Sequence, residues 1–166
     1  SLQCPLIGVN HVEAHPYANV ITHGELPFPI LHLVVAGGHT LLIEAKSHFD
    51  YKIIGRTLDD AAGECVDKVA KMFGHQMPGG PVVDQAALKF PGDIYDFPRP
   101  LLNKNGNNFS FSGLKTAMLR FRERHLENIS SKENGKMQIL EEGPVLSSFF
   151  QSVVDVLIHK TFKAAE

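Results

Sequence analysis

The chain has 166 residues, of which 43% are hydrophobic and 20% charged, a composition that disfavours disorder and coiled coil. Sixteen Lys and Arg residues against eighteen Asp and Glu give a formal charge of -2, so net charge lends no support to nucleic-acid binding. No apolar run approaches the ~20 residues of a membrane span, and Cys4 and Cys65 form no disulfide framework. We expect one or two compact domains in the cytoplasm, without membrane association.

At both ends of the sequence, the apolar pattern of a secondary-structure element lacks the neighbours or the stop signal that usually accompany it. The chain begins near an apolar stretch, Leu6–Val9, that predicts a buried strand with no preceding partner. It ends in an apolar helical pattern, Val153–Phe162, with no Gly or Pro stop after it. A domain that starts in a core strand and stops inside a helix indicates an internal fragment, incomplete at both ends.

A helix expected over about 11–22 carries the strongest local motif, Asn10-His11-Val12-Glu13-Ala14-His15. Residues four apart share a helix face, so His11 and His15 can present both imidazoles to one Zn or Fe ion. Glu13 lies on another side and, with Asn10 as N-cap, completes a predicted capping box. The spacing is not HExxH, and a chance pair of surface histidines explains it as well. A metal site would need a third ligand.

The next elements predict a hairpin. The apolar runs Ile30–Val35 and Leu41–Ala45 flank Gly37-Gly38, and a third strand is expected over 51–54. Paired glycines let backbone N–H groups approach a phosphate without side-chain obstruction. An ordinary tight turn explains the glycines at least as well, and the following His39 and Thr40 either add donors or pair with backbone. Both interpretations stay open.

Helices dominate the rest of the chain. Thr57-x-x-Asp60 resembles a capping box that opens a helix over 59–73, with Gly74 as a left-handed stop. Pro81 begins the next helix, which runs to about Leu88. We then expect, in order, a loop over 90–108, a short strand over 109–112, a basic helix from 113, a loose connection over 127–143 and a last helix from about 145. This mixture of helices, strands and a hairpin indicates an α/β or α+β class with mixed sheets.

A second glycine-rich loop, Pro78-Gly79-Gly80-Pro81, precedes the third helix. Glycines before a helix N-terminus make a place where phosphate or ribose can meet free N–H groups. Asp84, about one turn in, either accepts from ribose hydroxyls or merely favours the helix dipole. Asp67 lies mid-helix, where Asp is a poor helix former, and is either functional or paired with Lys71. Two glycine-rich loops and a His pair together suggest a nucleotide and a metal held in one protein.

These motifs resemble those of the TsaD family, once called the glycoprotease family, in its bacterial branch. Their order and spacing agree over nearly the whole chain, through His11-x-Glu13-Ala14-His15, Gly37-Gly38-His39-Thr40, Leu58-Asp59-Asp60-Ala61-Ala62-Gly63-Glu64, Asp67-Lys68, Pro78-Gly79-Gly80-Pro81, Phe97-Pro98-Arg99-Pro100 and Phe109-Ser110-Phe111-Ser112-Gly113-Leu114-Lys115-Thr116. The resemblance implies an actin/Hsp70-like (ASKHA) fold with two lobes around a nucleotide cleft. Residues 1–166 would be its central fragment, with the metal-binding helix and glycine hairpin in 1–55 and a mainly helical lobe in 56–166.

The resemblance also implies an activity: transfer of threonylcarbamoyl from threonylcarbamoyl-adenylate to N6 of the adenosine beside the anticodon, in tRNAs reading ANN codons. It implies His11 and His15 as ligands of one Fe or Zn ion. The implied adenylate contacts are Val34, Val35, Ala36, Gly37, Gly38, Asp67, Gly80 and Asp84. No catalytic side chain is assigned, and Lys115 belongs to a family motif without an assigned role. The implied partners are tRNA, a TsaB-like paralogue and a TsaE-like ATPase.

Two departures from the family pattern matter. Ala36 stands where many relatives carry Ser, which removes one side-chain donor. The family's third metal ligand, an Asp, and an Asn-containing adenosine loop fall beyond residue 166, so we predict that the isolated fragment is inactive. Two other classes stay open: a metallopeptidase, the O-sialoglycoprotein endopeptidase activity long ascribed to relatives, and a non-enzymatic nucleotide-binding ASKHA scaffold. The first is disfavoured by the absence of HExxH, and substitution of His11 and His15 would barely affect the second.

Overall fold

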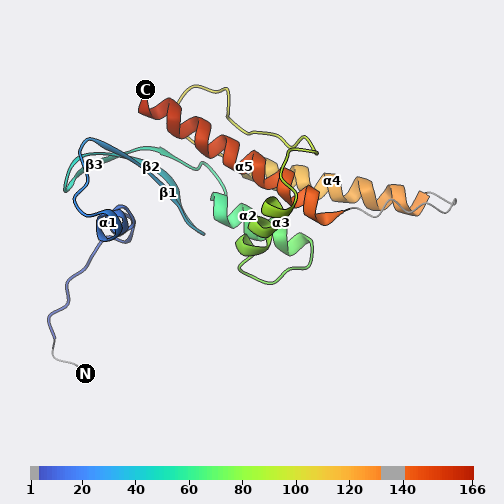
Figure 1. The fold of residues 1–166 in the computed structure, drawn as a ribbon, viewed down its shortest axis with the longest axis horizontal. Coiled ribbons are helices and arrows are strands. Elements are labelled where there is room, and N and C mark those ends of the chain that lie inside the picture. Colours follow the sequence, from blue (N-terminus) through green and yellow to red (C-terminus); the bar gives the residue numbers. More distant parts are fainter. Residues whose placement is uncertain (1–3, 132–140) are drawn as a thin grey trace.

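The computed structural model of the chain describes residues 4–131 and 141–166. It confirms the mixed α/β class: Figure 1 shows α1 and the sheet at one end of an elongated molecule, with α5 running along the helical part. In chain order the described elements are α1 His11–His23, β1 Ile30–Val35, β2 Thr40–Ser47, β3 Asp50–Arg56, α2 Ala62–Met72, α3 Gly80–Lys89, α4 Ser112–Ser131 and α5 Glu142–Ala165. None of the helices described is both long and apolar enough to cross a lipid bilayer.

The three strands form one antiparallel sheet in the order β1-β2-β3. Val35 pairs with Thr40, so the predicted hairpin around Gly37-Gly38 is confirmed. Side chains alternate across a strand, and Val34, Leu41 and Ile43 therefore share the face that packs against α1. Leu42 points to the opposite face and is fully buried in the main core. The sheet thus links the first helix to the helical part of the chain.

The main core lies among α2, α3, α4 and α5. Apolar residues at helical spacing make one face of α2 buried, and fully buried side chains from α4, from the segment just before α4 and from α5 meet it. The largest of these are Phe109, Phe111, Leu114, Met118, Leu146 and Phe149. Cys65 is buried as predicted, and desolvation raises the pKa of its thiol to about 12, so it remains a protonated hydrophobe.

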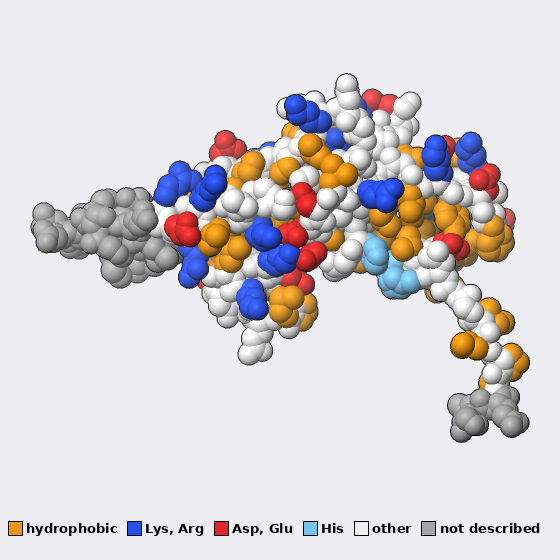
Figure 2. Space-filling model, turned by 180° about the vertical axis from the view of Figure 1, so that it is seen from behind, with side chains coloured by type: hydrophobic (Ala, Val, Ile, Leu, Met, Phe, Trp, Pro, Cys, Tyr) orange, Lys and Arg blue, Asp and Glu red, His pale blue; other side chains and the backbone are white. Residues whose placement is uncertain are grey.

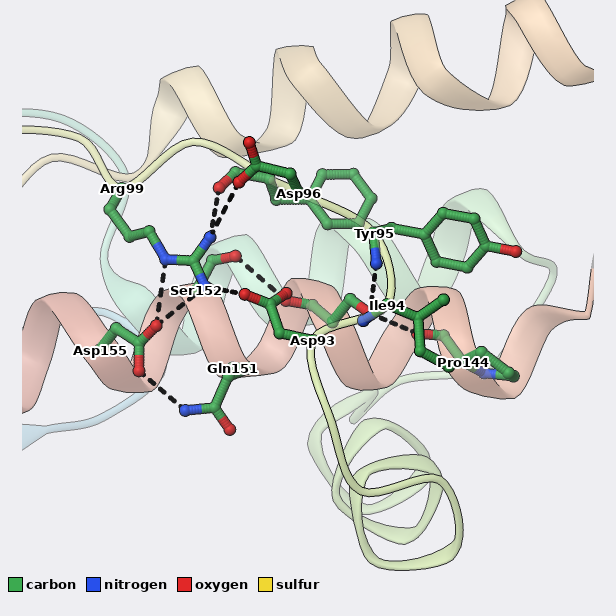
Figure 3. Close-up of polar contacts among 11 residues, drawn as sticks. Asp93, Ile94, Tyr95, Asp96, Arg99, Pro144, Gln151, Ser152 and Asp155 are labelled. Carbon is green, nitrogen blue, oxygen red and sulfur yellow. Dashed lines mark hydrogen bonds and ion pairs between the residues drawn. The ribbon is translucent and has the colours of Figure 1, made fainter.

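The loop over 90–108 is fastened to α5 by Arg99 (Figure 3). Its Nε and Nη2 donate to Oδ2 of Asp155 at 3.0 and 2.9 Å, and its Nη1 donates to the Phe97 carbonyl at 2.8 Å. Nη2 also pairs with Asp93. A planar guanidinium can satisfy several acceptors in this way, and the Arg99 side chain is only 18% exposed. The Phe-Pro-Arg-Pro motif therefore has a structural role.

Two predicted strands are wrong. Residues 6–9 have no regular structure, and Leu6 is 97% exposed. A strand needs a neighbour for its backbone hydrogen bonds, and none of the described residues pairs with this stretch. Residues 109–112 make a single parallel bridge, from Phe109 to Thr57, instead of a strand.

Three helix boundaries also differ from the prediction. The helix α2 begins at Ala62 rather than at residue 59. The Thr57 hydroxyl accepts from Asp59 N–H at 3.5 Å but donates to the Asp60 carbonyl at 2.7 Å, which forms a turn ahead of the helix. The helix α4 extends to Ser131, and α5 begins at Glu142, so less of the predicted connection over 127–143 is irregular. Residues 132–140 of that connection lie outside the described residues. Gly74, with φ of 88°, ends α2 as predicted.

Candidate metal and nucleotide site

The two histidines of α1 meet at the surface. Asn10 starts the helix as its N-cap, accepting at Oδ1 from Val12 N–H at 2.9 Å and Glu13 N–H at 3.4 Å. One turn of helix then places the Nε2 atoms of His11 and His15 3.3 Å apart. Two nitrogens bound to one tetrahedral metal at about 2.0–2.1 Å are separated by about 3.3–3.4 Å, so the pair fits one ion.

Among the residues that the structure describes, the histidine pair is not joined by a third metal-type ligand. Within residues 4–131 and 141–166 no group of three or more His, Cys, Asp or Glu side chains is placed to hold an ion. The pair fits Zn or Fe by donor chemistry, because neutral imidazole suits both metals. Its geometry does not select between them.

Glu13 anchors α1 instead of closing a capping box. Its carboxylate accepts a hydrogen bond from Tyr51, and this bond, with burial and the nearby negative charge, raises the pKa of Tyr51 to about 12. Val12 packs beside Tyr51 on the same sheet face. The predicted role of Glu13 as the partner of Asn10 is therefore replaced by a link to β3. This link turns the opposite side of the helix, with His11, outward.

The glycine hairpin ends beside the histidine pair. Ala36 N–H donates to the His39 carbonyl at 2.8 Å, which closes the turn between β1 and β2. The ring of His39 lies 5.7 Å from the ring of His11, centroid to centroid. Figure 2 shows histidine side chains gathered on one face, next to where the N-terminal stretch leaves the body. Helix and hairpin thus present their polar groups at one place.

Gly37 and Gly38 have open space where a side chain would stand. Both are exposed, neither has a positive φ, and a Cβ atom on either would meet no atom within 4 Å. Neither turn geometry nor packing among the described residues requires glycine there. This favours the interpretation that the loop gives a ligand access to its backbone over a plain turn.

The second glycine loop is held by α2. Asp67 accepts at Oδ1 from Gly79 N–H at 2.7 Å, and the predicted alternative, an ion pair with Lys71, is not formed among the described residues. Gly79 is buried against Ala70, where a Cβ atom would clash. Gly80 has open space, and Asp84 is exposed on the following α3. Asp67 therefore positions the loop, and Gly80 and Asp84 remain free to face a ligand.

The acidic pair Asp59 and Asp60 links the start of α2 to the start of α4, and Asp60 does not act in the predicted capping box with Thr57. Asp60 is bonded by Lys68 at 2.9 Å and Lys115 at 3.0 Å. Burial alone would raise the pKa of Asp60, but these two bonds outweigh it and hold the pKa below its usual value. Lys115 thus gains a structural partner. The adjacent Asp-Asp dipeptide was visible in the sequence, but its partners lie up to 55 residues away.

The other member, Asp59, caps α4 from a distance. Its Oδ1 accepts from the N–H groups of Phe111 at 2.8 Å and Ser112 at 3.2 Å, and its Oδ2 accepts from the hydroxyls of Ser110 and Ser112. A carboxylate at a helix N-terminus satisfies orphan donors and favours the dipole. The Phe-Ser-Phe-Ser motif is thereby fixed beside α2.

These residues define a mixed α/β chain with an imidazole pair next to a glycine hairpin, and comparison places it in a family of tRNA-modifying transferases. The family model described as tRNA N6-adenosine threonylcarbamoyltransferase, TsaD, matches residues 1–166. The chain belongs to the TsaD family. The family has the actin/Hsp70-like (ASKHA) type of fold, as the motifs predicted.

Curated relatives agree with this assignment, and each carries the name tRNA N6-adenosine threonylcarbamoyltransferase. The protein from Thermotoga neapolitana is 43% identical over 165 residues, which are 99% of this chain and 47% of the relative. Those from Syntrophotalea carbinolica and Halalkalibacterium halodurans are 45% and 47% identical, over 99% of this chain and 46% and 45% of the relatives. The chain thus spans about half the length of the curated relatives it matches.

Proposed function

We propose that this chain is the metal- and adenylate-binding part of an enzyme that transfers threonylcarbamoyl from threonylcarbamoyl-adenylate to tRNA. The acceptor is N6 of the adenosine beside the anticodon in tRNAs reading ANN codons. The observation that carries the proposal is the contact between His39 of the glycine hairpin and His11 of the histidine pair, whose ring centroids are 5.7 Å apart. The chain in which this contact occurs belongs to the TsaD family. This contact brings two imidazoles that can bind a metal next to a glycine loop that can bind a phosphate.

His11 and His15 would hold one Fe or Zn ion, which when bound supplies a Lewis acid for a carbonyl oxygen. Backbone N–H groups from Val34 to Gly38 would bind the adenylate phosphate. Gly80 and Asp84 would contact the nucleoside, with Asp67 holding their loop through Gly79. The role of these residues is to fix the adenylate while the acceptor amine approaches.

The reaction balances without a protein nucleophile. Nitrogen N6 forms a bond to the carbamoyl carbon, the bond from that carbon to the phosphate oxygen breaks, and AMP leaves with the electron pair. One proton passes from the amine to solvent or to the released phosphate. Because the mixed anhydride is already activated, we assign no catalytic side chain.

The wider assignment follows from the same proposal. We place the metal-binding helix and glycine hairpin in residues 1–55 and a mainly helical lobe in 56–166. Partners would be tRNA, a TsaB-like paralogue and a TsaE-like ATPase, in the cytoplasm where tRNA is modified. No observation in this chain favours the peptidase or the scaffold.

Nucleoside mass spectrometry of tRNA tests the proposal. The protein in its full natural length, with its partners and threonylcarbamoyl-adenylate, should produce threonylcarbamoyladenosine, and His11→Ala should abolish it. His23→Ala is the matched control, because His23 is an exposed histidine in the last turn of the same helix. A folded wild type that yields no modified adenosine would refute the transferase assignment. The isolated 166-residue chain should be inactive.

A further inference from the structure

Thr40 joins the glycine hairpin to the start of α2. The N-cap residue of α2, Ala61, has no side chain that can cap the helix. Thr40, which is fully buried, supplies the missing acceptor: its Oγ1 accepts from Ala62 N–H at 2.9 Å. Its carbonyl also accepts from Thr57 N–H at 3.0 Å. A residue at the end of the hairpin loop therefore caps a helix that begins 22 residues later.

Gly63, the second residue of α2, lies directly against the loop. A Cβ atom at Gly63 would stand 2.8 Å from the Ala36 oxygen, 3.0 Å from the Gly37 Cα and 3.1 Å from the Ala36 carbonyl carbon. All three are backbone atoms, which cannot rotate away as a side chain can. Only glycine fits at this position without displacing the Ala36-Gly37 peptide.

The same face of α2 holds the second glycine loop. Gly63 and Asp67 are four residues apart and therefore lie on one side of the helix, about 6 Å apart along its axis. Asp67 is the residue that accepts from Gly79 N–H at 2.7 Å. One helical turn thus contacts the hairpin loop at one end and the Gly79-Gly80 loop at the other, and sets the separation between them.

Besides the pairing of β1 with β2 and the ring contact between His39 and His11, the hairpin loop is supported by its contacts with α2. Gly37 and Gly38 are exposed and have no neighbours within 4 Å of a built Cβ atom. The bond from Ala36 N–H to the His39 carbonyl, 2.8 Å, closes the turn but does not fix it relative to the rest of the chain. Its position relative to the Gly79-Gly80 loop therefore depends on the contacts of Thr40 and Gly63.

We infer that Gly63 is a positioning residue for the adenylate. It lets α2 press against the Ala36-Gly37 peptide, so that the N–H groups of the hairpin loop meet the phosphate at a fixed distance from the Gly79-Gly80 loop. The inference rests on the proposed function and names the residue that sets the geometry of its adenylate site. A side chain at position 63 shifts one loop relative to the other, and no single placement of the adenylate then satisfies both.

Gly63→Ala tests this inference in the full-length protein, with Gly113→Ala as the matched control. Gly113 is also near the start of a helix, but its nearest contact to a built Cβ atom is 3.8 Å away, an ordinary packing distance. The readouts are KM and kcat for threonylcarbamoyl-adenylate, the Kd of AMP by calorimetry, and the unfolding midpoint. Gly63→Ala should raise KM and the Kd of AMP about 10- to 100-fold, the range expected for losing one hydrogen bond to a charged group.

A merely structural role gives a different result. A destabilised fold lowers the active fraction, and hence the apparent kcat, while KM stays that of the wild type. Unchanged KM and AMP affinity in Gly63→Ala would overturn the inference. If the wild type binds AMP but shows no transfer, the proposed function fails, and the AMP titration still tests Gly63.

A second pair of variants covers the case in which Gly63→Ala does not fold. Thr40→Val removes the hydroxyl that caps α2 at nearly constant volume, whereas Thr40→Ser keeps it. The Val variant should bind AMP at least about tenfold more weakly than the Ser variant, because it loses the bond that fixes the hairpin to α2. Equal affinities for AMP in the two variants would overturn the inference.

Discussion

The helices α1 and α2 are similar in length, 13 and 11 residues, but they use their side chains differently. In α1 no residue is buried, whereas α2 buries Ala62, Cys65, Val66, Val69 and Ala70 in the main core. The histidine pair therefore lies on a helix whose sequence is little constrained by packing within the described residues. The other face of α2, with Gly63 and Asp67, does not pack in the core but contacts the two glycine loops. It aligns the two glycine loops.

Because of this difference, we expect the residues that stabilise the fold and the residues of the candidate site to lie in different parts of the chain. The small cluster of Val34, Leu41 and Ile43 under α1 contains far less buried apolar surface than the core of the helices. Burial of apolar area is the main stabilising term, so most of the folding free energy resides in the helical part. Under the proposed function, exposed side chains of α1 should therefore be replaceable at small cost in folding free energy but large cost in activity.

The largest effect on stability should come from the core of α5. Phe149 is fully buried, and Phe149→Ala should lower the free energy of unfolding by about 3–5 kcal/mol, through lost burial and a cavity. Phe162, in the same helix but 70% exposed, is the control, and Phe162→Ala should change it by less than about 0.5 kcal/mol. Denaturant titration measures both. Equal effects would show that α5 is packed differently.

The Arg99 network should give the next largest effect. Arg99→Met removes a side chain that binds Asp155 twice and the Phe97 carbonyl once, and it leaves those acceptors without this donor. Because the group is partly exposed, we expect a loss of about 1–3 kcal/mol by denaturant titration. Arg120→Met, at an exposed position of α4, should be nearly neutral. A neutral Arg99→Met would mean that other contacts hold the loop over 90–108, such as the bonds from Ile94 N–H and Tyr95 N–H to the Ser148 hydroxyl.

Asp59 should make stability depend on pH in the acid range. Burial raises its pKa, but the bonds from Ser110, Phe111 and Ser112 outweigh it, so the folded-state pKa is below the usual value. A depressed carboxyl pKa contributes stability above the unfolded value, about 3.9, that is lost as pH falls through the folded-state pKa. Asp59→Ala should cost about 1–2 kcal/mol at neutral pH, by urea titration. This difference from wild type should shrink below about pH 3.9; a pH-independent difference would contradict the capping role.

The smallest effect on stability should come from α1. His11→Ala and His15→Ala remove exposed or half-buried rings and should change the free energy of unfolding of the metal-free protein by less than about 0.5 kcal/mol. Calorimetry in the presence of a chelator measures this. A loss comparable to that of Phe149→Ala would show that α1 is part of the core, and the contrast between the two regions would disappear.

Local patterns predicted the elements that depend on neighbours in sequence. The Asn10 cap, the hairpin around Gly37-Gly38 and the Gly74 stop are signalled within a few residues, and the structure confirms them. What sequence reasoning missed depends on distant partners. Thr40 caps α2, which begins 22 residues later, although the sequence predicted Thr57 as the cap of that helix. Asp59 caps α4, which begins 53 residues later.

The glycines show the same limit within the candidate site. The sequence predicted that Gly37 and Gly79 both belong to loops that approach a ligand, and it gave Gly63 no role beyond its place in a family motif. The structure separates Gly37, which has open space, from Gly63 and Gly79, where neighbouring atoms leave no room for a side chain. Only the folded chain shows which glycines make room for a ligand and which allow two segments to touch.

The most direct test of the account is the metal content of the full-length protein, measured by inductively coupled plasma mass spectrometry. Wild type and His23→Ala should carry the same Fe or Zn content, whereas His11→Ala and His15→Ala should each lose most of it. That result would establish the exposed pair on α1 as metal ligands. Equal metal content in all four proteins would contradict the account, because the histidine pair would then be an ordinary surface feature.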